Sequence, residues 1–90
     1  MNTHYFFPPA EAYALNRCLF RLKSEAAYRR RFAADPEAAM TEASLDAPRL
    51  AALTAFDRDR LVSLGAHPYL VFMADLRLKM ERAPAAFEEF

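Results

Sequence analysis

Residues 69–80 have the sequence Tyr69-Leu70-Val71-Phe72-Met73-Ala74-Asp75-Leu76-Arg77-Leu78-Lys79-Met80. At helical spacing the apolar residues form two stripes: Tyr69, Phe72, Met73, Leu76 and Met80 make one, and Leu70, Val71, Ala74 and Leu78 make the other. A helix that is apolar on nearly every side is typically buried on both sides. We therefore expect this helix to be either the central helix of the fold or a helix half-exposed to another subunit.

Proline and glycine delimit this helix. His67-Pro68 is expected to open it, since proline suits the first helical turn. We expect it to run to about Arg82 and to stop before Pro84. Gly65 is the only glycine of the chain, and it is predicted to end the preceding helix in a left-handed conformation.

Shorter helices are expected before it, and three of them begin at aspartates that can cap a helix: Asp35, Asp46 and Asp57. Ser24 is expected to cap another, in which Ala27, Tyr28 and Phe32 face inward and Glu25 pairs with Arg29 one turn later. The first helix should start near Pro8-Pro9. Its predicted buried stripe consists of Ala12, Leu15, Leu19 and Leu22.

The sequence contains no sustained alternation of apolar and polar residues, which would indicate a strand, and no Asn-Gly or Asp-Gly hairpin turn. Residues 8–83 are therefore predicted to form a single helical domain, all-α, a compact orthogonal bundle of about five short helices. The segments 1–7 and 84–90 carry aromatic residues and are predicted to be tails. These tails either fold back over the small core or grip a partner.

Composition excludes several classes of function. Twelve basic and twelve acidic residues give a net charge of zero, so the chain has no electrostatic attraction to nucleic acid or anionic lipid. Arg29-Arg30-Arg31 would fan around a helix rather than form one patch. No apolar run approaches the length of a membrane span, and the N-terminus lacks the pattern of a secretory signal. We expect a cytoplasmic protein.

Histidine and cysteine, which are common metal ligands and catalytic residues, are scarce in this chain. The chain has two histidines, His4 and His67, and one cysteine, Cys18, and nothing in the sequence brings them together. We expect no metal site, no cofactor site and no catalytic residue in this chain, and Cys18 is expected to be an inert packing residue. Residues 57–82 resemble a helix-turn-helix, but the second helix begins with apolar residues, so DNA binding is not expected.

Four ordered segments carry a family resemblance. They are Asn16-Arg17-Cys18-Leu19-Phe20, the stretch Arg31-Phe32-Ala33-Ala34-Asp35-Pro36-Glu37-Ala38, the helix from Leu50 to Asp57, and Leu61-Val62-Ser63-Leu64-Gly65-Ala66-His67-Pro68-Tyr69-Leu70. Over roughly residues 14–75, the chain resembles the small (alpha, LigA-type) subunit of the class II extradiol aromatic-ring-opening dioxygenases, the protocatechuate and gallate type.

The resemblance implies a helical, non-catalytic subunit in a complex for aromatic compound catabolism. In that family the catalytic Fe(II) and its ligands belong to a separate large (beta) subunit, whose active-site cleft the small subunit caps. The residues expected at the partner interface are His67, Pro68, Tyr69, Leu70, Phe72 and Met73. The alternative is a stand-alone helical interaction or regulatory module that self-associates and has no enzyme partner.

Overall fold

The structure is a computed structural model that describes residues 10–83. Within this range the chain forms six helices and no strand: α1 (Ala10–Ser24), α2 (Ala26–Ala34), α3 (Pro36–Glu42), α4 (Ala47–Ala55), α5 (Arg58–Ser63) and α6 (Pro68–Arg82). The all-α prediction is confirmed, with one helix more than the five or so expected. The tails predicted at 1–7 and 84–90 lie outside the described residues.

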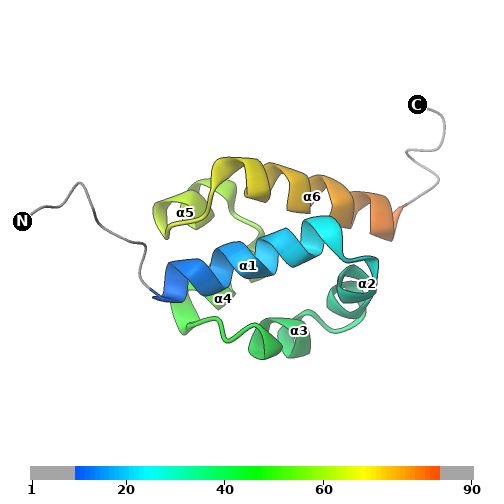
Figure 1. Ribbon diagram of the computed structural model, residues 1–90, viewed down its shortest axis with the longest axis horizontal. Coiled ribbons are helices and arrows are strands. Elements are labelled where there is room, and N and C mark those ends of the chain that lie inside the picture. The colour runs from blue at the N-terminus through cyan, green and yellow to red at the C-terminus, as the bar shows by residue number, and fades with distance from the viewer. Residues whose placement is uncertain (1–9, 84–90) are drawn as a thin grey trace, which may run out of the picture.

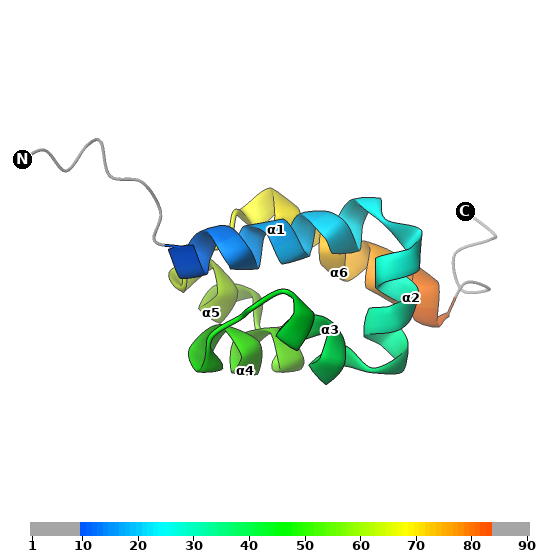
Figure 2. The same cartoon turned by 60° about the horizontal axis from the view of Figure 1, so that its bottom comes forward.

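The two longest helices, α1 and α6, lie side by side and run in the same direction (Figure 1). Helix α5 packs at the beginning of α6, and α2 lies across the other end of the α1–α6 pair. Helices α3 and α4 cover the side of α1 that comes forward in Figure 2. None of the described helices is long and apolar enough to cross a membrane.

The core lies between these helices and contains the stripe predicted for α1. Ala12, Leu15, Leu19 and Leu22 are all buried, together with Cys18. On α2 the inward direction of Tyr28 and Phe32 is confirmed, whereas Ala27 is exposed, contrary to the prediction. Helix α6 contributes Val71, Ala74 and Leu78.

The three predicted aspartate caps are confirmed. Asp35, Asp46 and Asp57 each accept a hydrogen bond from the backbone N–H three residues later, at 3.1 to 3.2 Å. Each bond satisfies one of the amides that a helix start leaves without an intrahelical partner. These short-range signals therefore fix where α3, α4 and α5 begin.

The predicted start of α2 is wrong. Ser24 is the last residue of α1, and the residue before α2 is Glu25, whose side chain makes no capping hydrogen bond. Glu25 pairs with Arg21 of α1, at 3.2 Å, and not with Arg29. The Arg29 guanidinium instead donates to two carbonyl oxygens at the end of α1, those of Leu22 and Lys23. Arg29 thereby satisfies carbonyls that the end of α1 leaves open.

Candidate functional site

One side of α6 carries several exposed apolar side chains. Tyr69 and Phe72 are 54% and 51% exposed, and Met73, Leu76 and Met80 are partly exposed. We call these five residues the α6 face. The other stripe of the helix packs inward, through Val71, Ala74 and Leu78. Within the chain the helix is therefore half-exposed rather than central, and contact of its exposed side with another subunit stays a prediction.

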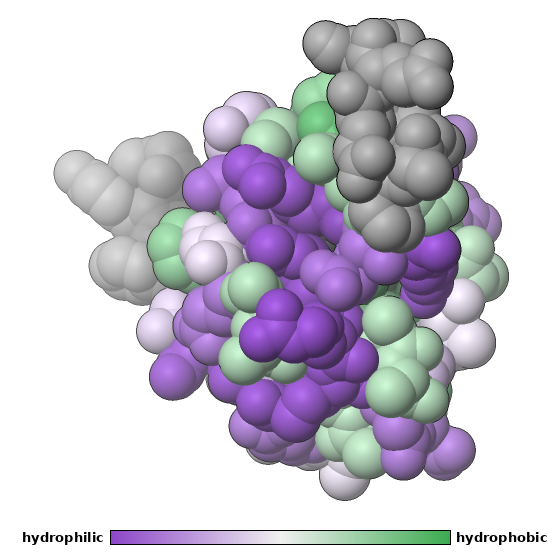
Figure 3. Space-filling view, turned by 90° about the vertical axis from the view of Figure 1, so that its right-hand side faces the viewer, coloured by the Kyte–Doolittle hydropathy of each residue, from purple (hydrophilic) through white to green (hydrophobic). Residues whose placement is uncertain are grey.

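Outside α6, large apolar side chains are exposed singly at Tyr13 and Phe20 of α1 and at Val62 of α5. Figure 3 views the end where α2 and the last turn of α6 lie, and hydrophilic side chains dominate that view. A large exposed apolar patch on a small protein marks an interaction site. The α6 face is therefore the candidate docking surface.

The start of α6 is held by a residue of α1. The side-chain amide of Asn16 accepts a hydrogen bond from the backbone N–H of His67 at 2.7 Å and donates one to the carbonyl of Gly65 at 2.9 Å. Its Nδ2 also donates to the carbonyl of Ala12, one turn earlier in α1. Asn16 thus uses both ends of its amide to fix the turn between α5 and α6.

Gly65 makes that turn possible. Its backbone φ angle of 107° lies in a region that residues other than glycine rarely adopt. A Cβ added at Gly65 would lie 2.7 Å from the Cβ of Ala12, which is too close for two carbon atoms. The predicted left-handed glycine is confirmed, and its close approach to α1 brings the turn within reach of Asn16.

His67 and Pro68 shape the first turn of α6. The Nδ1 of His67 accepts a hydrogen bond from the backbone N–H of Tyr69 at 3.1 Å, so the imidazole serves as the helix cap. With Nδ1 as an acceptor, the neutral imidazole carries its hydrogen on Nε2, and His67 is exposed. Pro68 occupies the first helical position, where its lack of an N–H costs nothing.

The structure places the predicted interface residues on two sides of α6. His67, Pro68, Tyr69 and Phe72 are exposed, and Met73 is partly exposed. Leu70 is different, because it is partly buried and packs against the core. Their role in binding a partner stays a prediction.

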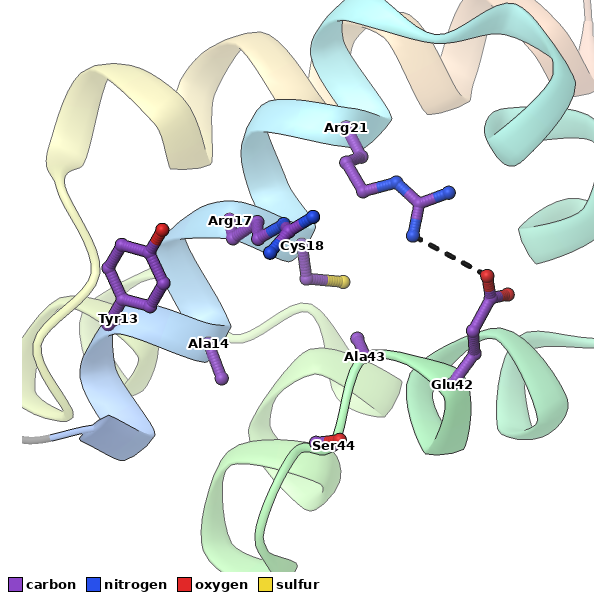
Figure 4. A pocket seen from close by; sticks show the side chains of 8 residues that line it. All are labelled: Tyr13, Ala14, Arg17, Cys18, Arg21, Glu42, Ala43 and Ser44. Carbon is purple, nitrogen blue, oxygen red and sulfur yellow. Dashed lines mark ion pairs between the residues drawn. The ribbon is translucent and has the colours of Figure 1, made fainter.

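A groove between α1 and the end of α3 has a volume of about 330 Å³ (Figure 4). Tyr13, Arg17 and Arg21 line one wall and Glu42 and Ser44 the other, with Arg21 paired to Glu42 at 3.6 Å. Cys18 also lines this groove but is buried. The arrangement places no base next to a nucleophile.

Burial raises the pKa of the Cys18 thiol, and hydrogen bonding with Tyr28 offsets this only in part. The Tyr28 hydroxyl donates to the carbonyl of Ala39 at 2.7 Å. With its hydrogen used in that bond, the hydroxyl oxygen is the acceptor for the Cys18 S–H, at 3.4 Å. Cys18 is therefore held as a neutral thiol within the packing of α1, α2 and α3.

The chain is similar to one family of known proteins. The family model described as "Aromatic-ring-opening dioxygenase LigAB, LigA subunit" matches residues 15–89. The chain belongs to the LigA-subunit family. A search of curated proteins and a search of solved structures gave no match. The LigA assignment confirms the predicted resemblance and makes this chain a small subunit of an aromatic-ring-opening dioxygenase, a family that implies a heteromeric partner.

Iron chemistry does not fit the described part of this LigA-family chain. Residues 10–83 contain no group of three or more His, Cys, Asp or Glu side chains that could hold a metal ion. His67 caps α6, and Cys18 is buried in the core. His4 lies outside the described residues.

Sequence reasoning missed Asn16 as the residue that positions the candidate site. The available signal was an asparagine in the middle of a helix, where its propensity is poor. An interior asparagine of this kind often bonds to backbone elsewhere. Its partners are 49 and 51 residues away, so the pattern of α1 alone could not identify them.

Proposed function

We propose that this LigA-family chain is the non-catalytic small subunit of an extradiol dioxygenase, and that it docks through the α6 face and closes the iron site of a separate large subunit. Family membership supports the role of small subunit. Within residues 10–83 no three His, Cys, Asp or Glu side chains are grouped so that they could hold a metal ion, which is consistent with chemistry on another chain.

The observation that carries the proposal is the exposed α6 face. Tyr69 and Phe72 are each about half-exposed although both are large aromatic residues. Covering the exposed part of each against a partner would be worth about 2 kcal/mol, from the area that an aromatic ring buries. Aromatic residues and methionine are also enriched in the centres of protein interfaces. The composition of the face, and the free energy that its burial would contribute, are therefore typical of the centre of an interface.

The chain's own residues define how this surface would work. Asn16 and Gly65 fix the beginning of α6, so Tyr69 and Phe72 are presented on a rigid helix. A rigid apolar surface loses little conformational entropy on binding. Seated over a cleft, it excludes water from the reacting groups beneath it and strengthens the electrostatic interactions there.

Reconstitution tests the proposal. The LigB-type large subunit of the same genome is purified alone, loaded with Fe(II), and assayed for ring cleavage of protocatechuate and gallate with and without this chain. We expect ring cleavage, or the half-life of the active enzyme, to rise when the chain is added at equal concentration. No complex and unchanged activity and half-life would contradict the proposal.

A further inference from the structure

Two cationic side chains border the α6 face on α6 itself. Successive residues of a helix are about 100° apart around its axis. Arg77 therefore lies beside Met73 on one edge of the face, and Lys79 lies beside Leu76 on the other. Both are exposed. The edges of the face thus carry positive charge on both sides.

The two carboxylates of α6 are both shared with cations of neighbouring helices. Asp75 pairs with Arg58 of α5 and with Lys79, and its side chain is 13% exposed. Glu81 pairs with Arg29 of α2 at 3.7 Å. Through these ion pairs, Arg58 and Arg29 also lie next to α6.

Helix α1 extends the same pattern. Asn16 touches the start of α6, and Phe20 is one helical turn further along on the same side of α1. Phe20 is 49% exposed, and the Lys23 ammonium lies 5.2 Å from the centre of its ring. An exposed aromatic with an adjacent cation therefore lies on α1, one turn beyond the residue that contacts the start of α6.

Arg77 and Lys79 lie on α6 beside the face, and Arg58 and Arg29 pair with its carboxylates Asp75 and Glu81. These four cations therefore face two carboxylates. The whole chain nevertheless has a net charge of zero. The positive charge is therefore concentrated around the exposed apolar residues.

We infer that the α6 face fits a heterologous protein surface with an apolar centre and a border of Asp and Glu side chains. This inference rests on the proposed function, and assigns that surface to the large subunit. A second copy of this chain fits poorly, because pairing two α6 faces would bring two cationic borders together. The five apolar side chains equally disfavour nucleic acid, which is read by polar and charged groups.

Salt titration with charge variants tests the inference. Affinity for the purified LigB-type large subunit is measured by calorimetry at about 50 and about 500 mM NaCl. The double variant Arg77→Glu/Lys79→Glu is expected to bind about tenfold more weakly at low salt and to lose most of the salt dependence. Arg30→Glu, an exposed cation on α2, is the matched control and should bind like the wild type.

The outcomes separate this inference from the proposed function. If the wild-type chain fails to bind at either salt concentration, the proposed function fails. If it binds equally well at both, or if the double variant binds like Arg30→Glu, only the acidic border is contradicted. The neutral variant Arg77→Gln/Lys79→Gln, with helicity checked by circular dichroism, should give an intermediate affinity and thereby excludes misfolding as the cause.

Two further measurements can overturn the inference. Sedimentation velocity of the isolated chain should show a monomer, and a stable dimer that Phe72→Glu dissociates would assign the α6 face to self-association. The isolated chain should not bind vesicles of phosphatidylserine and phosphatidylcholine. Vesicle binding that Arg77→Glu/Lys79→Glu abolishes would assign the cationic border to a lipid surface.

Discussion

The Oδ1 atom of Asn16 accepts a hydrogen bond of 2.7 Å from the backbone N–H of His67, 51 residues further along the chain. His67 in turn caps α6 through its Nδ1 atom. One side chain of α1 therefore fixes the residue that begins α6. The position of the α6 face relative to the rest of the fold depends on this contact.

Replacing Asn16 with alanine should destabilise the protein by about 1–3 kcal/mol, because the N–H of His67 and the carbonyl of Gly65 both lose a partner. Urea unfolding followed by circular dichroism measures the change. Asn16→Asp keeps an acceptor for His67 but loses the donor to Gly65, so it should lie between wild type and Asn16→Ala. Equal stability of wild type and Asn16→Ala would show that the contact contributes nothing.

Gly65→Ala should cost about 2–4 kcal/mol, because the new Cβ would meet Ala12 and because alanine at a φ of 107° is strained. Adding Ala12→Gly removes the collision but not the strain. The double variant should therefore be more stable than the sum of the two single effects predicts. Strictly additive free energies of unfolding would rule out the close approach.

Local signals made most of the fold predictable. An aspartate at the start of a helix acts within three residues, so Asp35, Asp46 and Asp57 could be assigned from the sequence. Gly65 was similarly recognisable because it is the only glycine. Periodicity located the buried stripe of α1 for the same reason, since it depends only on neighbours along one helix.

Predictions failed or stayed open where partners come from other helices. Glu25 was expected to pair with Arg29, but Arg29 reaches the carbonyls that end α1, and this preference is invisible along one helix. The two stripes of α6 were both recognised. Which of them is buried depends on how α1, α2 and α5 pack against the helix, so the α6 face could only be located in the structure.

Cys18 should be protected from thiol reagents in the native protein. Burial raises the pKa of its thiol, and only the thiolate reacts rapidly. We expect less than stoichiometric labelling by iodoacetamide at pH 8 over times that label a model thiol fully, and complete labelling in guanidinium chloride. Mass spectrometry of the intact chain reads the result. Rapid native labelling would mean that the thiol is neither buried nor held neutral.

Asp75 should contribute to stability in a pH-dependent way. Partial burial alone would raise the pKa of its carboxyl, but hydrogen bonds from Arg58 and Lys79 outweigh burial and lower it. A lowered pKa in the folded state gives stability that is present above the ordinary pKa of Asp, about 4, and is lost as the pH falls through the folded value.

Comparison of the wild type with Asp75→Asn isolates this contribution. The wild type should be more stable at pH 7, and the difference should shrink as the pH is lowered from about 4 towards 2. Urea unfolding at a series of pH values gives both curves, and Asp59→Asn, which is exposed on α5, serves as the control. A difference that does not vary with pH would contradict the role assigned to the Asp75 ion pairs.

The central claim is that the α6 face binds the large subunit, and sedimentation velocity of mixtures with the LigB-type large subunit tests it most directly. Phe72→Glu places a charge within the α6 face, whereas Tyr13→Glu places the same charge on another exposed aromatic, in the groove between α1 and α3. We predict that the wild type and Tyr13→Glu sediment with the large subunit and that Phe72→Glu sediments alone. Co-sedimentation of Phe72→Glu at the wild-type affinity would contradict the claim.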